Sequence, residues 1–505
     1  MTKAEFSSTI MDVPISVFAL VVVVAVTALF CVGNVLYNIF LHPLRNFPGP
    51  LVCRASPFFR HYKFLTGDLL YATKALHDTY GPVVRITPNE LSFISPEAWK
   101  DIYVPHGGSA RLGDMARYPR FYQWAGENSP ETLVSLNRPY HDSMKRQLAP
   151  AFSERALRFQ EPIMHHYVDL LIRKLHEDSQ NGQHPVNLRE WFNYYTFDMI
   201  GNLGFGSDFA GLTTEKYHPW VKAVSQNVVE FSFMQVLMYL GFSRLVHALA
   251  NSSVLKGKVL HEHLTREKVE ARLRQEQPRP DLIQPLLDRK EPLSKAQILE
   301  NASQLITAGS ESSSTLLVAT VSLLTDNPTA KQKLTEEIRS SFQDEDEINL
   351  ISVNSLTYLS ACLNETLRCF PAVPPALPRV TPPGGAVIAG HTVPENSQTV
   401  VYVASWASYH SEQHFAEPFE FHPERFLRDA RFAEDRFDAF QPFGLGHGSC
   451  PGRNLAFAET RLAMAKLIYN FDIDGVPGNG SWTSQQKAYM LWDKKPFWAL
   501  LKPVR

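Results

Sequence analysis

A glycine-rich loop near the carboxyl end of the chain holds a single cysteine. The loop reads Phe443-Gly-Leu-Gly-His-Gly-Ser-Cys-Pro-Gly452. Three glycines within five residues allow a tight, irregular backbone that can lie flat against a planar group. Cys450 stands at the start of a helix expected from about Gly452, and the partial positive charge of a helix amino terminus stabilises a thiolate. A single thiolate in this setting suits an axial iron ligand.

Two other interpretations of Cys450 are open. It can be a buried free cysteine after a flexible turn. It can also join His447 in a zinc site, although no third and fourth ligands are evident. The chain has 505 residues, only five cysteines and no C-x-x-C pair, so neither a disulfide framework nor a zinc ribbon is expected. The glycine spacing and the helix start favour the iron ligand.

A second polar cluster, Ala308-Gly-Ser-Glu-Ser312, lies in the middle of a long helical segment. Gly309 inside a helix costs about 1 kcal/mol relative to alanine, and a flat cofactor with bound O2 against the helix would explain it. Glu311 and the Ser312 hydroxyl can then relay protons to that oxygen. The alternative is a polar stripe on a buried helix.

Two charged motifs follow along the chain. In Glu365-Thr-Leu-Arg368 the two charged residues are three positions apart, so they share one face of a helix. Taken alone, such a pair is an ordinary surface salt bridge. The segment Phe421-His-Pro-Glu-Arg-Phe426 supplies a further cation, Arg425.

Together, these motifs resemble those of the cytochrome P-450 monooxygenases, in the same order and over almost the whole chain. The family's heme-thiolate loop has the pattern F-G-x-G-x-R-x-C-x-G. The matching positions are Phe443, Gly444, Gly446, Cys450 and Gly452. The family's arginine, which contacts a heme propionate, is replaced by Gly448, and His447 is expected to replace it in part.

The resemblance implies roles for further residues. Ala308 to Ser312 resembles the oxygen-activating A-G-x-[DE]-T motif, with serine in place of threonine, so the hydroxyl is kept and the methyl is lost. The implied triad of Glu365, Arg368 and Arg425 has a structural role, because it locks the meander that leads to the cysteine loop. The expected propionate partners, for which a solvated surface base is the alternative, are His141, Lys145 and Arg379.

The resemblance also implies an activity. The chain is expected to carry heme b, with Cys450 as the axial ligand, and to insert one atom of O2 into a lipophilic small molecule. No G-x-G-x-x-G follows a strand, so electrons are expected from NADPH through a separate cytochrome reductase. Desaturation, ring closure or phenol coupling on the same fold is the first alternative, and a heme-binding sensor or carrier without turnover is the second.

Two further patterns bear on the substrate. The run Tyr80-Gly-Pro-Val-Val-Arg-Ile-Thr-Pro-Asn-Glu90 most resembles fungal members that work in secondary metabolism. Substrate recognition is expected in three aromatic-rich loops, at residues 118–124, 231–242 and 489–492. Aromatic runs are also ordinary core, so these loops indicate a lipophilic substrate and no more.

The elements that must position these residues are mostly helices, with a minor strand component. The resemblance implies a large helical domain, a long central helix and a small β-rich region. A capping box at Ser294 and Gln297 predicts the start of that long helix, and Asn327-Pro328 ends it. Other helices are expected at 156–177 and 454–470, and strands at 82–87 and 398–403.

The amino-terminal segment predicts one membrane anchor. Residues 13–40 carry no charge, and about 20 apolar residues span a bilayer. We therefore expect a short lumenal segment at 1–12, a transmembrane anchor at 13–41, a proline-rich spacer at 42–50 and a cytosolic catalytic domain at 51–505. A cleaved secretory signal is the alternative, but no basic run precedes the apolar segment.

The charge pattern indicates the topology and excludes one class of partner. Basic residues are more frequent after the apolar segment than before it, so the catalytic domain is expected to face the cytosol. The resemblance places the anchor in the endoplasmic-reticulum membrane. The net charge is only −2, which argues against a nucleic-acid partner.

Overall fold

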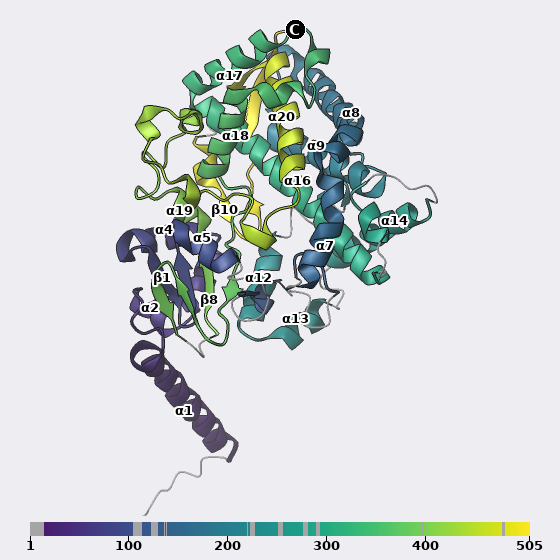
Figure 1. Ribbon diagram of the computed structural model, residues 1–505. Coiled ribbons are helices and arrows are strands. Elements are labelled where there is room, and N and C mark those ends of the chain that lie inside the picture. The colour runs from purple at the N-terminus through teal and green to yellow at the C-terminus, as the bar shows by residue number, and fades with distance from the viewer. Residues whose placement is uncertain are drawn as a thin grey trace, which may run out of the picture.

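A computed structural model shows a mainly helical body with a smaller β-rich region and one projecting helix (Figure 1). It describes residues 15–104, 114–122, 130–135, 137, 139–219, 221–222, 228–250, 256–275, 281–288, 293–394, 398–476 and 480–505. The predicted lumenal segment 1–12 and residues 123–124 of one predicted substrate loop lie outside these ranges. The predicted fold class, mainly α with a minor β part, is confirmed.

The helices fall into two groups. Those of the helical body are α7 (Tyr140–Leu148), α8 (Glu154–Ser179), α9 (Leu188–Phe205), α10 (Gly211–Thr214), α12 (Val228–Tyr239), α13 (Ser243–Ala250), α14 (Lys256–Leu273), α15 (Gln284–Leu287), α16 (Lys295–Asp326), α17 (Pro328–Ser341), α18 (Thr357–Cys369) and α20 (Arg453–Asn470). The others are α1 (Ile15–Leu36), α2 (Leu51–Ala55), α3 (Phe58–Leu65), α4 (Leu69–Tyr80), α5 (Pro96–Tyr103), α6 (Pro119–Tyr122) and α19 (Ser405–Tyr409).

The largest sheet in the described residues has five strands in the order β1-β2-β8-β5-β3. Its strands are β1 (Val83–Thr87), β2 (Glu90–Phe93), β3 (Ala116–Arg117), β5 (Arg379–Val380) and β8 (Val400–Val403). Strands β2 and β8 run parallel, and the other neighbours run antiparallel. A second sheet joins β4 (Val186–Asn187), β12 (Trp498–Pro503) and β9 (Phe471–Gly475), and the two hairpins are β6 (Ala386–Ile388) with β7 (His391–Val393) and β10 (Lys487–Ala488) with β11 (Trp492–Asp493).

The long helix α16 begins and ends where the sequence predicts. The Ser294 side chain accepts from the Gln297 N–H and the Gln297 side chain accepts from the Ser294 N–H, so the capping box is present. Gly309 makes a packing contact, and its expected role beside a flat cofactor stays a prediction. A Cβ at Gly309 would lie 3.3 Å from Ile200 of α9, so the missing side chain lets the two helices approach closely.

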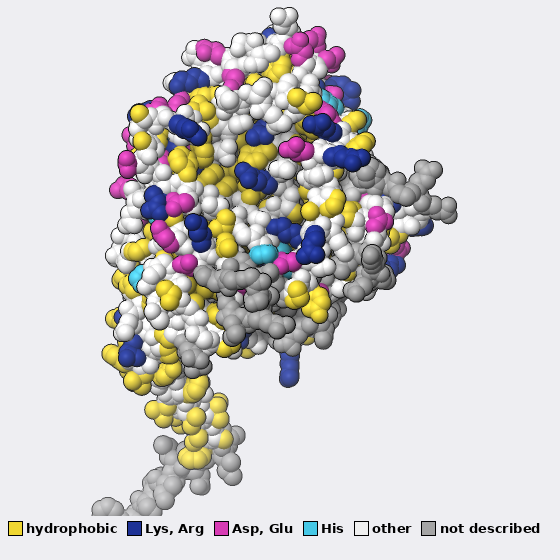
Figure 2. All heavy atoms as spheres, viewed as in Figure 1, with side chains coloured by type: hydrophobic (Ala, Val, Ile, Leu, Met, Phe, Trp, Pro, Cys, Tyr) yellow, Lys and Arg dark blue, Asp and Glu magenta, His cyan; other side chains and the backbone are white. Residues whose placement is uncertain are grey.

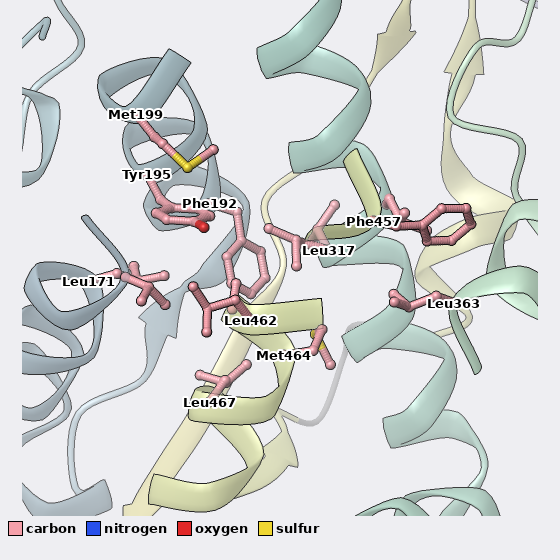
Figure 3. Packing of buried hydrophobic residues seen from close by; sticks show 14 of the residues in the cluster. Leu171, Phe192, Tyr195, Met199, Leu317, Leu363, Phe457, Leu462, Met464 and Leu467 are labelled. Atoms are coloured by element: carbon pink, nitrogen blue, oxygen red, sulfur yellow. The ribbon is translucent and has the colours of Figure 1, made fainter. Parts of the chain in front are cut away.

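The main core lies where five of these helices meet. Leu171 of α8, Phe192 of α9, Leu317 of α16, Leu363 of α18 and Leu462 of α20 are fully buried in one cluster (Figure 3). Burying a side chain of this size contributes about 1.5–3 kcal/mol. The core therefore joins α16, which carries the predicted oxygen-activation motif, to α20, which follows the cysteine loop.

The amino-terminal helix projects from that body. Residues Val17–Leu41 form a helical segment long and apolar enough to cross a membrane, with a hydropathy of 2.6. Figure 2 shows its apolar side chains as a yellow stalk outside the body. The end of the stalk is tied down, because Arg85 of β1 donates to the Asn38 carbonyl at 3.0 Å and Leu44 of the proline-rich segment is fully buried.

Candidate active site

The cysteine loop is a closed turn in front of α20. The Cys450 N–H donates to the Phe443 carbonyl at 2.8 Å, which brings the two ends of the loop together. Gly446 has a φ of +68°, and a Cβ there would lie 2.4 Å from the Tyr103 carbonyl oxygen. Only glycine fits such a position. Helix α20 then begins at Arg453, with Gly452 as its N-cap.

Cys450 is an exposed thiol, and among the chain's five cysteines only Cys31 of the apolar stalk shares that exposure. Protein atoms packed around the Cys450 side chain partly desolvate the thiol and so raise its pKa, while the Gly452 N–H and the Lys145 ammonium group lower it. Burial raises the pKa of Cys53 and Cys369 to about 12, and Cys362 is also buried. Cys450 is therefore the accessible thiol of the globular part.

Helix α7 holds the loop from outside. Lys145 donates to the His447 carbonyl at 2.8 Å, to the Ser449 carbonyl at 2.7 Å and to the Ser449 hydroxyl at 2.8 Å. These contacts use the three N–H donors of the Lys145 ammonium group and join α7 to the loop. Binding of a propionate by Lys145 stays a prediction. His447 also contacts α7, with its Nδ1 3.2 Å from Asp142 Oδ2.

A pair of arginines lies on the other side of the loop. Arg117 of β3 and Arg379 of β5 face each other in register on neighbouring antiparallel strands. Two cations side by side repel, and burial together with Arg379 lowers the pKa of Arg117 to about 10. Arg379 Nε is buried and has no hydrogen-bond partner in the described part of the chain. An anion between the two guanidinium groups would offset their repulsion and accept a hydrogen bond from Arg379 Nε.

Gly448, which stands where the family pattern has arginine, lies beside Arg379. A Cβ at Gly448 would lie 2.9 Å from Arg379 Nη2, so the Arg379 guanidinium occupies space that a side chain at 448 would need. The Arg379 guanidinium thus lies next to the loop position at which the family pattern has its arginine. His141 of α7 is buried, and burial with the nearby Arg117 lowers its pKa to about 4, so the imidazole is neutral at pH 7. Its Nδ1 lies 3.1 Å from Asp142 Oδ1, so the one N–H of the ring is donated to that carboxylate.

One face of α16 is accessible although the helix is otherwise largely buried. Ala308 is exposed, and Gly309 and Ser312 are half-buried, whereas Ser310, Glu311 and the run 313–322 are buried. Residues four apart lie on the same side of a helix, and the Ser312 hydroxyl donates to the Ala308 carbonyl at 2.6 Å. This accessible strip coincides with the oxygen-activation motif.

Glu311 has a buried partner that sequence reasoning missed. Lys494, which follows β11, places its Nζ 2.9 Å from Glu311 Oε2. The same ammonium group donates to the hydroxyls of Ser314 and Thr315 at 3.1 and 3.0 Å. Burial lowers the pKa of Lys494, and the Glu311 carboxylate opposes that shift. No sequence signal pointed to Lys494, since 183 residues separate it from Glu311.

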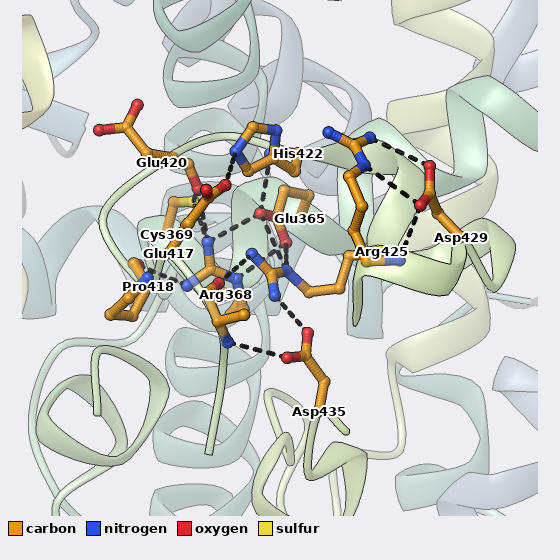
Figure 4. Close-up of polar contacts among 12 residues, drawn as sticks. Glu365, Arg368, Cys369, Glu417, Pro418, Glu420, His422, Arg425, Asp429 and Asp435 are labelled. Atoms are coloured by element: carbon orange, nitrogen blue, oxygen red, sulfur yellow. Dashed lines mark hydrogen bonds and ion pairs between the residues drawn. The ribbon is translucent and has the colours of Figure 1, made fainter. Parts of the chain in front are cut away.

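The predicted charged triad is present and fully buried (Figure 4). The Glu365 carboxylate accepts from Arg368 Nε and Nη2 at 2.8 and 2.7 Å and lies 3.4 Å from Arg425 Nε. Arg425 also forms an ion pair with Asp435, a fourth member that the sequence reasoning missed. Two acids therefore balance two arginines.

The same arginines hold the backbone of the meander. Arg368 donates to the carbonyls of Tyr409, Pro418 and Glu420, and Arg425 donates to the carbonyl of Ala416 at 2.9 Å. Every backbone acceptor lies in the segment before the cysteine loop. The network therefore fixes the path of the chain into that loop.

Comparisons with known proteins agree with this architecture. The family model for cytochrome P450 matches residues 50–500. The chain belongs to the cytochrome P450 family. It is 40% identical over 475 residues to cytochrome P450 monooxygenase 1 of Neocamarosporium betae, covering 94% of this chain and 96% of that protein. It is 41% identical to cytochrome P450 monooxygenase tpeC of Talaromyces stipitatus, covering 94% and 93% of the two chains. It is also 38% identical to averantin hydroxylase of Dothistroma septosporum, covering 94% and 90%.

Membership of the cytochrome P450 family makes this chain an oxidoreductase of the monooxygenase type, with heme b as cofactor and O2 as co-substrate. It also implies a redox partner and a small-molecule substrate. The residues of this structure fit a heme. Cys450 offers an accessible sulfur, and Arg379 Nε is an unsatisfied buried donor beside the cysteine loop.

Proposed function

We propose that this cytochrome P450 is a membrane-anchored monooxygenase of fungal secondary metabolism that oxidises a lipophilic small molecule. Electrons come one at a time from NADPH through a separate reductase. When bound, heme supplies the iron-centred activation of O2 that inserts one oxygen atom into the substrate. Fungal monooxygenases of similar length and about 40% identity support this assignment.

The chain's own residues have distinct roles in this proposal. Cys450 is the axial ligand, and a thiolate there pushes electron density toward the iron. Arg379 and Arg117 would bind a propionate, while Lys145 and His447 hold the loop and α7 together. Lys145 therefore acts on the ligand through the loop backbone.

Proton delivery is assigned to α16. The Ser312 hydroxyl lies on the accessible strip of the helix and can pass a proton to oxygen bound there. The Glu311 carboxylate is the relay group that takes up a proton and passes it on to Ser312. Because Lys494 lies 2.9 Å from Glu311, it sets the ionisation of that acid. A carrier without turnover would have no use for this arrangement.

The observation that carries the proposal is the single accessible thiol of the globular part, at the closed turn before α20. The reduced protein under carbon monoxide should show the strongly red-shifted Soret band of thiolate-ligated heme. Cys450→Ala should abolish that band. Cys31→Ala, at the other exposed cysteine, is the matched control and should keep it. A band that survives loss of Cys450 would overturn the ligand assignment.

The anchor is assigned to the endoplasmic-reticulum membrane with the catalytic domain in the cytosol. Basic residues after the apolar helix, such as Arg45, Arg54 and Lys63, support this orientation. Protease added to intact microsomes should digest the catalytic domain. Protection until detergent is added would reverse the topology.

A further inference from the structure

A pocket lies between α3, α4, α12 and the β-rich region. Its walls bring together residues of all three predicted substrate loops: Phe121 from the first, Gln235 and Tyr239 from the second, and Tyr489 from the third. Other walls are apolar, including Phe64, Leu69 and Trp406. The three loops are far apart in sequence, so their meeting in one pocket is a result of the tertiary fold.

Two residues that line the pocket each carry a buried donor without a hydrogen-bond partner among the residues that the structure describes. The donors are Arg60 Nη1 and the Tyr239 hydroxyl. Arg60 is 8% exposed and Tyr239 is 9% exposed. A buried polar group without a partner costs about 1–3 kcal/mol. Both residues line the pocket.

These two donors form one group. The Arg60 guanidinium carbon lies 4.2 Å from the centre of the Tyr239 ring, a cation–π contact. Tyr239 also packs edge-on against His61 and Tyr118, which fixes the direction of its ring. The donors are therefore held rigidly, as a site that recognises one chemical group requires.

The charge at the pocket is already balanced. Arg60 Nε donates to Glu90 Oε1 at 2.9 Å, and both side chains are buried. The Glu90 carboxylate neutralises the guanidinium charge, so a second carboxylate from a ligand would meet repulsion. The unsatisfied donors suit a neutral acceptor, such as a carbonyl or phenolic oxygen.

We propose that this pocket binds the oxygen-bearing end of a neutral, largely apolar substrate, whose oxygen accepts hydrogen bonds from Arg60 Nη1 and the Tyr239 hydroxyl. The proposal rests on the proposed function only in naming the bound molecule as the substrate. The apolar remainder of the molecule packs against Phe64, Leu69 and Phe121. Arg60 and Tyr239 are then specificity-determining residues.

The experiment compares ligands that differ in one group. Fluorene, fluorenone and fluorene-9-carboxylate share a ring skeleton, and only fluorenone offers a neutral acceptor. Equilibrium dialysis against the solubilised, heme-loaded full chain should show fluorenone binding about tenfold more tightly than fluorene. The carboxylate should bind no more tightly than fluorene. Tighter binding of the carboxylate would overturn the neutral-acceptor class.

Tyr239→Phe is the decisive variant, because it removes the hydroxyl and keeps the ring. It should reduce the preference for fluorenone over fluorene by about threefold or more and leave fluorene affinity unchanged. Tyr71→Phe is the matched control, since the Tyr71 hydroxyl already donates to the Gln486 carbonyl at 2.8 Å. Tyr71→Phe should leave the ligand preference unchanged.

Thermal unfolding provides a readout that needs no ligand. Tyr239→Phe should leave the unfolding midpoint unchanged or raise it, whereas Tyr71→Phe should lower it, because only the second variant loses a hydrogen bond. An equal drop in both variants would mean that the Tyr239 hydroxyl has a partner within the protein, and the proposal would fail.

The role of Arg60 is tested by replacing both members of the Arg60–Glu90 ion pair with neutral residues. Arg60→Met alone would strand the buried Glu90 charge, so it is combined with Glu90→Gln, and the double variant should lose most of the fluorenone preference. If the double variant keeps the preference for fluorenone, Arg60 does not donate a hydrogen bond to the ligand. The carbon monoxide band, recorded on the same samples, separates the two proposals: a normal band without fluorenone preference overturns the pocket assignment alone.

Discussion

The Nζ atom of Lys494 lies 2.9 Å from Oε2 of Glu311, and both side chains are buried. The two residues come from different parts of the fold, the segment after β11 and the middle of α16. The charge of Arg189 also lowers the pKa of Lys494, and Glu311 helps to raise the pKa of Tyr217. Glu311 is thus held as one half of an ion pair.

Replacing Lys494 should therefore change the protonation of Glu311. Lys494→Met leaves a buried carboxylate without its counter-ion, which costs about 3–5 kcal/mol unless the carboxylate takes up a proton. Infrared difference spectra should show a new protonated carboxyl band, and that band should vanish when Glu311→Gln is added. With the reductase present, more NADPH should be consumed for hydrogen peroxide.

Lys495→Met is the matched control for that experiment, because Lys495 is the exposed neighbour of Lys494. It should leave the infrared spectrum and the peroxide yield as in the unchanged protein. An unchanged carboxyl region in Lys494→Met, or the same peroxide yield in both variants, would contradict the assigned role of Lys494.

Arg379 and Gly448 should compensate for each other. Arg379→Ala should lower heme retention several-fold, measured as heme transfer to apomyoglobin, because a propionate loses its charged donor. Adding Gly448→Arg places a guanidinium in the space vacated by Arg379 and should restore much of the retention. In the unchanged background, Gly448→Arg should weaken retention, since a Cβ at 448 lies 2.9 Å from Arg379 Nη2. Additive losses in the double variant would contradict this relationship.

Loss of Glu365 should destabilise the meander. Glu365→Ala leaves the fully buried Arg368 without its acid, and breaking such a pair costs about 3–5 kcal/mol. Chemical denaturation and heme content should both report the loss. Asp78→Ala, which removes an exposed partner of Lys74, is the control and should cost about 1 kcal/mol or less. Equal effects of the two changes would exclude a structural role for Glu365.

Glu459 of α20 should make stability depend on pH. Its carboxyl accepts from Ser313 with one oxygen, its other oxygen has no partner, and burial raises its pKa to about 8. Between the unfolded value near pH 4.5 and pH 8 the folded state binds more protons, so stability falls as pH rises. The slope is about 1.4 kcal/mol per pH unit.

Glu459→Gln keeps the shape and removes the titration. Urea denaturation of the heme-loaded protein should show a higher free energy of unfolding than the unchanged protein at pH 8 and little difference near pH 5. A pH dependence that stays the same after this change would mean that another group titrates.

Local spacing predicted several features from sequence. The capping box at Ser294 depends on residues three positions apart, and the Glu365 and Arg368 pair on one helix face does too. The tight turn before α20 follows from glycine spacing. These predictions succeed because helix geometry relates nearby positions in the same way in every protein.

Only the tertiary structure decided which distant groups meet. Lys494 reaches Glu311 across 183 positions, and Arg117 faces Arg379 through strand register. Neither pairing leaves a local pattern, because packing of whole elements brings the side chains together. The close approach of Gly309 to Ile200 of a neighbouring helix likewise leaves no local pattern. The sequence determined the family and the chemical types of the site residues, and the packed fold decided their partners and hence their roles.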